Sequence, residues 1–147
     1  MLKSLIIPTC TALTLSMVGC ATMSNPSTER NLDDLQGKNW ILSEIDGVKL
    51  VADPAQSSVP SIMFDNERVS GSDGCNSFMG GYAVKATEIK FSNLASTRKA
   101  CLNATDIAHK YSQALGQVTQ YDASKKELKF LDANKKVILK FDIAQSN

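Results

Sequence analysis

The sequence has few of the side chains that metal centres and histidine-dependent active sites require. Its 147 residues include a single histidine, His109, and four cysteines. Charge of neither sign predominates, since 16 Lys and Arg face 15 Asp and Glu, and there is no polybasic run. This balance does not favour nucleic acid or an anionic lipid surface as a partner. A structural zinc site needs more ligands than the chain offers at suitable spacing.

A hydrophobic run long enough to cross a membrane is missing as well. The apolar stretch at residues 5–18 follows Lys3 and covers about fourteen residues, whereas a spanning helix needs about twenty. A short apolar stretch after a positive start is typical of a secretory signal. The N-terminus therefore predicts export rather than a permanent membrane span.

The apolar stretch ends in MVGC at residues 17–20, which resembles the bacterial lipobox. In that motif the cysteine receives the lipid and becomes the mature N-terminus. We expect a lipoprotein signal peptide over residues 1–19, palmitate-type acylation of Cys20 and a flexible tether over residues 20–34. Ala21 at the next position indicates the outer membrane, with the domain facing the periplasm. The alternative is an ordinary cleaved signal followed by a chance cysteine.

The mature chain would then keep two free cysteines, Cys75 and Cys101, because Cys10 leaves with the signal. Two thiols in an oxidising envelope allow one pairing, and a structural disulfide is the usual result. This bridge would close a loop of about 25 residues and stabilise the fold by roughly 3.5 kcal/mol in the chain-entropy model.

Residues 35–147 form one expected domain, built mainly from short strands. Segments with alternating apolar and polar side chains, or rich in β-branched and aromatic residues, are separated by turn residues. They are residues 37–47, 61–65, 68–71, 78–84, 88–92, 127–132 and 136–142. In the first segment, strict alternation predicts Trp40 and Leu42 on one face and Ile41 and Ile45 on the other.

A different spacing occurs at residues 104–118, where apolar side chains recur with the period of a helix. The predicted fold class is thus mostly β (α+β). It is a compact antiparallel β-barrel-like domain of about seven or eight short strands, with one α-helix inserted before the last strands. Closure into a barrel would remove exposed sheet edges.

The glycine-rich stretch GSDGCNSFMGGY at residues 71–82 invites several chemical readings. It lacks the Gly-Lys-Ser/Thr ending of a phosphate loop, and no acid closes it as in a calcium loop. A nucleophilic Cys75 would need a base, but helical geometry places His109 toward solvent. We therefore expect a structural bend with no catalytic residue, no metal and no cofactor.

Four motifs occur in a characteristic order: LQGKNWILSEIDG at 35–47, GCN at 74–76, GGY at 80–82 and LASTRKAC at 94–101. Together they closely resemble the META domain of HslJ-like envelope proteins. The resemblance implies a compact antiparallel β fold with a helix, no cofactor, no established enzymatic activity and loose links to heat shock and drug tolerance. The signature residues that it marks are Gly74, Cys75, Asn76, Thr97, Arg98 and Cys101.

The leading functional hypothesis is a non-enzymatic, membrane-tethered lipoprotein that binds an unknown envelope protein or wall component and supports tolerance of stress or drugs. Alternatives are an inhibitor of a cell-wall hydrolase or protease, and a small lipocalin-like ligand binder suggested by GKNW at 37–40. A partner would bind at the end of the barrel, where the bridge would gather Asp73, Asn76 and Arg98. In the competing reading, Arg98 only pins the bend by bonding Asp73 or strand-end carbonyls.

Overall fold

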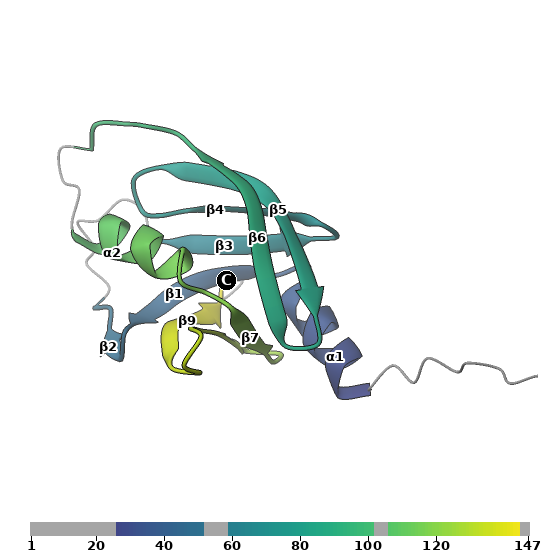
Figure 1. The fold of residues 1–147 in the computed structure, drawn as a ribbon. Helices are drawn as coiled ribbons and strands as arrows, with labels where there is room; N and C mark the ends of the chain where they lie inside the picture. The colour runs from purple at the N-terminus through teal and green to yellow at the C-terminus, as the bar shows by residue number, and fades with distance from the viewer. Residues whose placement is uncertain (1–25, 52–58, 102–105, 145–147) are drawn as a thin grey trace, which may run out of the picture.

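A single antiparallel sheet of nine strands dominates the computed structural model, which describes residues 26–51, 59–101 and 106–144 (Figure 1). The strands are β1 (Asn39–Ile45), β2 (Val48–Lys49), β3 (Ser61–Asp65), β4 (Arg68–Ser72), β5 (Ser77–Lys85), β6 (Glu88–Ser96), β7 (Gln120–Ala123), β8 (Glu127–Leu131) and β9 (Val137–Ile143). The helices are α1 (Pro26–Leu35) and α2 (Asp106–Leu115). The mostly β fold with a helix before the last strands is therefore confirmed. The expected signal peptide and Cys20 lie outside the described residues.

The sheet closes into a ring because β1 pairs on both of its sides. Trp40 of β1 lies opposite Ile62 of β3 on one side and opposite Ile143 of β9 on the other. The remaining strands follow in chain order, each antiparallel to the one before. The weakest junction joins β6 to β7. Among the described residues, Glu88 and Gln120 are the one pair of residues that lie opposite each other there.

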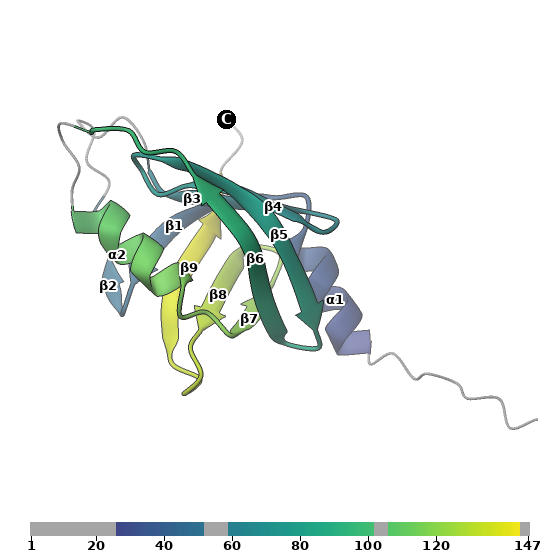
Figure 2. The ribbon, with the colours of Figure 1, turned by 45° about the horizontal axis from the view of Figure 1, so that its top comes forward.

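Aromatic side chains fill the interior of the ring. The rings of Phe64 and Phe130 lie 6.1 Å apart between centroids, those of Phe130 and Phe141 5.4 Å, and those of Phe141 and Tyr111 6.2 Å. All four side chains are fully buried. Tyr111 belongs to α2, which packs against β9 and β1 (Figure 2). The chain's own side chains thus form the core that a ligand would otherwise occupy.

The expected alternation in β1 is wrong at Ile45. This side chain is buried together with Trp40 and Leu42, whereas Ile41 is half-buried. The pairing of β1 with β9 shifts register between Leu42 and Glu44. Such a bulge adds one residue to a strand and reverses the alternation beyond it, so Ile45 returns to the core.

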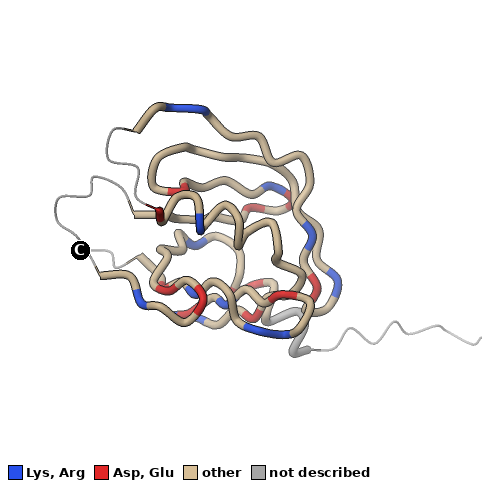
Figure 3. Tube along the Cα trace, turned by 60° about the vertical axis from the view of Figure 1, so that its left-hand side comes forward, with Lys and Arg blue, Asp and Glu red and all other residues tan. Residues whose placement is uncertain are grey.

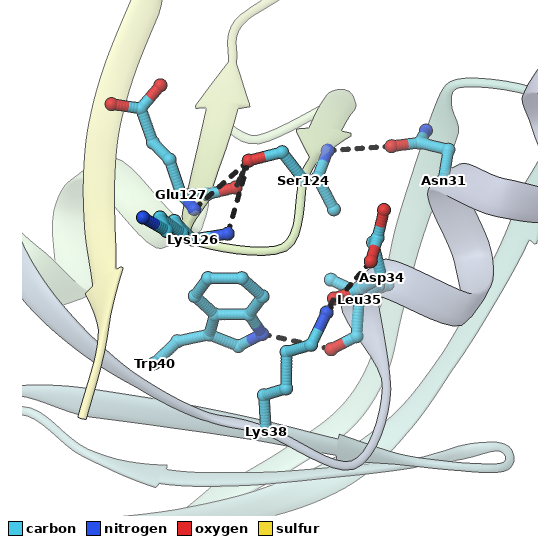
Figure 4. A network of polar contacts seen from close by, with 9 residues as sticks. Asn31, Asp34, Leu35, Lys38, Trp40, Ser124, Lys126 and Glu127 are labelled. Atoms are coloured by element: carbon cyan, nitrogen blue, oxygen red, sulfur yellow. Dashed lines mark hydrogen bonds and ion pairs between the residues drawn. The ribbon is translucent and has the colours of Figure 1, made fainter. Parts of the chain in front are cut away.

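The flexible tether expected over residues 20–34 is also corrected, because its second half is the helix α1. Leu35 at the end of this helix is fully buried, and its carbonyl oxygen accepts a hydrogen bond from the Trp40 indole N–H at 2.9 Å (Figure 4). The Asn31 side chain accepts a hydrogen bond from the Ala123 backbone N–H of β7 at 2.6 Å. α1 is therefore docked onto the ring. None of the helices in the described ranges has the length and apolar character needed to cross a membrane.

We predict that Leu35→Ala destabilises the domain by about 2–5 kcal/mol, because it removes buried methyl groups and leaves a cavity beneath α1. Urea denaturation of the mature chain measures the change. The exposed Asp33 on the same helix provides the matched control, since Asp33→Ala should change stability by less than about 0.5 kcal/mol. Equal stability of the two variants would show that α1 is not part of the folded unit.

Candidate functional site

The β4–β5 turn is organised by Asp73, the one buried charged side chain among the described residues. Its Oδ1 atom accepts hydrogen bonds from the backbone N–H groups of Cys75, at 2.8 Å, and Asn76, at 2.6 Å. Gly74, which lies between Asp73 and Cys75, has a φ of 95°, which residues with a Cβ rarely adopt. The sequence Asp-Gly at this position therefore closes a tight bend, as expected.

A disulfide fastens this turn to the segment that follows β6. Cys75 and Cys101 are bonded, with their Cα atoms 6.0 Å apart. The bridge spans a sequence separation of 26 residues, so it limits the freedom of β5, β6 and the segment after them in the unfolded chain.

Asn76 strengthens the same connection through its side chain. Its Oδ1 atom accepts hydrogen bonds from the Lys99 backbone N–H at 2.7 Å and from the Thr97 hydroxyl at 3.1 Å. The Thr97 hydroxyl oxygen in turn accepts the Ser77 backbone N–H at 3.1 Å. We call Asp73, Cys75, Asn76, Thr97 and Cys101 the disulfide clip. It holds the end of β6 against the start of β5.

Helix α2 reaches the disulfide clip through Ser112. The Ser112 hydroxyl lies 3.5 Å from Oδ2 of Asp73, at the limit of a hydrogen bond. Burial, and then the charge of Asp73, raise the pKa of the Tyr111 hydroxyl above its usual range. Tyr111 therefore stays a neutral core residue at any physiological pH.

A shallow pocket of about 510 Å³ lies over the disulfide, and Asp73, Cys75, Ser112 and His109 are among its lining residues. His109 is exposed as expected, but it borders the same pocket as Cys75. The Cys75 sulfur is engaged in the bridge, so the pair cannot act as thiolate and base. Among the described residues, no three His, Cys, Asp or Glu side chains gather in a way that could hold a metal ion.

The structure brings most of the predicted site residues together but leaves Arg98 out. Arg98 is exposed, and within the described residues it forms no ion pair with Asp73 and no hydrogen bond to a strand end. The pinning contact expected of Arg98 is replaced by Asn76. The sequence did not predict the contacts of Lys99 and Ser112. Lys99 contributes its backbone N–H, and the residue type gives no information on how a backbone group is used.

A small ring of antiparallel strands, with a helix packed into it and a disulfide clip at one end, defines a class of compact β domain. The family model described as META domain matches residues 33–145, and the chain belongs to this family. The predicted resemblance is thereby confirmed. No curated protein matches the sequence.

Solved structures share the fold. A protein from Burkholderia xenovorans, solved by NMR, is 21% identical with a TM-score of 0.63, over 95% of this chain and 100% of that chain. Another NMR structure is 24% identical with a TM-score of 0.60, over 76% and 92%. A crystal structure of a DUF4847 family protein from Bacteroides vulgatus is 13% identical with a TM-score of 0.53, over 77% and 96%. At these identities the likeness establishes the fold alone.

We predict that Asn76→Ala lowers the free energy of unfolding by about 1–3 kcal/mol, because it leaves the Lys99 N–H and the Thr97 hydroxyl without their shared acceptor. Arg98→Ala, between the two contact partners in the sequence but exposed, should change it by less than about 0.5 kcal/mol. Denaturation of the oxidised mature chain compares the two. A larger loss for Arg98→Ala would contradict the assignment of the pinning role to Asn76.

Proposed function

We propose that the protein is a non-enzymatic, membrane-tethered envelope lipoprotein that binds another envelope component through its outer surface. The observation that supports this proposal is that the signature residues form structural contacts with one another. Cys75 and Cys101 are bonded to each other, and Asn76 and Thr97 hold the end of β6. Signature residues that fix the shape of one end of a rigid domain are consistent with a binding scaffold, because binding residues commonly lie on loops that such a scaffold positions.

The filled interior supports surface binding over the lipocalin-like alternative. Phe64, Phe130 and Phe141 occupy the centre of the ring and are fully buried. Small barrels with interiors packed in this way have no room to hold a ligand inside. A partner would therefore meet the outer faces, edges and end loops of the ring.

Membrane tethering is proposed from MVGC at residues 17–20 after an apolar stretch, with Cys20 as the lipidated residue and Ala21 as the outer-membrane sorting signal. A lipid anchor of several acyl chains holds firmly, whereas one chain binds reversibly. A role in stress or drug tolerance is what the family resemblance suggests.

In-cell photo-crosslinking tests this proposal. A benzophenone amino acid is placed singly at three exposed positions on different parts of the surface: Val48 on β2, Ser92 on β6 and Lys125 in the β7–β8 turn. We expect at least one position to give a specific crosslinked species in the membrane fraction. Cys20→Ser should abolish both fatty-acid labelling and that crosslink.

Absence of a crosslink at every position, with the protein lipidated and folded, would contradict a binding role. Persistent fatty-acid labelling of the Cys20→Ser variant would contradict the anchor. Identification of the captured species by mass spectrometry separates the two binding hypotheses, because a wall hydrolase or protease would favour the inhibitor and a structural envelope component the scaffold.

A further inference from the structure

Strand β6 has one edge that no described strand occupies. It pairs with β5 from Glu88 to Ser96, but with β7 only where Glu88 lies opposite Gln120. The last backbone hydrogen bond across this junction is donated by the Ile89 N–H to the Thr119 carbonyl at 3.1 Å. Beyond Ile89 the strand continues without a neighbour on that side in the described part of the chain.

The hydrogen-bond pattern fixes which backbone groups face this open side. In an antiparallel strand, successive residues direct their N–H and C=O groups to opposite sides. Because the Ile89 N–H points toward β7, the groups of Phe91 point the same way. The Thr97 N–H donates to the Ser77 carbonyl on β5 at 3.0 Å, so the preceding residue, Ser96, faces the open side. We call residues 91–96 the β6 edge.

A bulge divides the β6 edge but leaves it accessible. The register shifts opposite Gly80, and Asn93 has a φ of 51°. All side chains from Ser92 to Ala100 are exposed. Leu94 on the edge is 40% exposed, and Met79 on the adjacent strand is 59% exposed. Apolar contact area therefore lies next to unpaired backbone groups.

Along the chain, the β6 edge and the segment after it carry charge of one sign, although Asp73 and Asp106 line the same pocket as Lys99. From residue 89 to residue 105 the sequence contains three cations, Lys90, Arg98 and Lys99, and no acid. None of the three forms an ion pair among the described residues. Arg98 and Lys99 are adjacent on the segment after β6. Figure 3 shows a blue stretch, for Lys or Arg, at the top of the trace. The nearest acid along the strand is Glu88, at the β7 junction.

From this combination we infer that the β6 edge is a site of β-strand addition, which receives an extended, acidic segment of a partner protein. Unpaired N–H and C=O groups in a row are satisfied by an extended backbone. The exposed cations select acidic residues at the ends of that segment, and Leu94 offers contact to an apolar side chain. This inference rests on the proposed binding function and names its surface and partner chemistry.

Peptide titrations followed by NMR test the inference on the mature chain, produced with Cys20→Ser. The probe is acetyl-Asp-Glu-Val-Thr-Val-Thr-Val-Glu-Asp-amide. We expect saturable shifts of the Phe91 and Ser96 amide signals. N-methylation of alternate peptide nitrogens should weaken binding at least about tenfold, because it removes backbone hydrogen bonds and leaves the protein unchanged. Replacement of the four acids by lysine should also weaken binding about tenfold.

Protein variants then test the role of charge. Lys90→Glu and Arg98→Glu should each weaken binding about two- to fivefold, as expected for exposed charges. Lys125→Glu, an equal change in the β7–β8 turn, provides the matched control and should leave the affinity unchanged. Equal effects of all three variants would show that binding depends only on the net charge of the protein, and would contradict a site at the β6 edge.

Other outcomes also overturn the inference. Equal binding of the N-methylated and unmodified peptides would exclude strand addition. β6-edge signals that shift with protein concentration alone, together with a dimer in analytical ultracentrifugation, would assign the edge to a second copy. In cells, a crosslink at Val48 or Lys125 but none at Ser92 would refute this site while leaving the proposed binding function intact.

Discussion

The amide oxygen of Asn76 and the neighbouring disulfide hold together two parts of the chain on which the proposed binding surface depends. One is the turn before β5, and the other is the segment that leaves β6. Thr97 and Lys99 bond to Asn76, and Cys101 bonds to Cys75. With both kinds of bond at the same end, β6 is fixed at its far end, even though no strand of the described residues lies beside its outer edge there.

This arrangement explains how a closed ring can keep an accessible edge on β6. β1 closes the ring by pairing with both β3 and β9, so most strands have two neighbours. β6 departs from this rule after Ile89, where its pairing with β7 ends and no other described strand lies on that side. Exposed edges are usually removed or blunted, and here the bulge at Asn93 shortens the regular edge. What remains is short, extended and flanked by cations.

Sequence patterns were sufficient for the elements whose side chains alternate regularly. They identified most strands, α2 and the pairing of Cys75 with Cys101. They failed for the facing of Ile45 in β1, because a bulge returns this side chain to the core. No residue type in β1 predicts a bulge of that kind. They missed β7 because its four residues are too short for a period to be evident.

The remaining errors share one physical cause, because each depends on a contact with a distant backbone group. α1 has a polar sequence, and its placement depends on Leu35 and on the Trp40 indole bonding its carbonyl. At the disulfide clip, the charged side chain of Arg98 is the contact that the sequence suggests, but the contact to Asn76 is made by the backbone N–H of Lys99. Backbone donors are the same at every residue except proline, so their use can be read only from the fold.

The most direct test of this account is the hydrogen-exchange rate of the Lys99 amide in the oxidised mature chain. Both Lys99 and Ala100 lie in an exposed segment outside any strand. The bond from the Lys99 N–H to Asn76 at 2.7 Å predicts exchange at least about tenfold slower than that of the Ala100 amide, because exchange requires this bond to open. Equal rates for the two amides would contradict the central claim that Asn76 and the disulfide hold the end of β6.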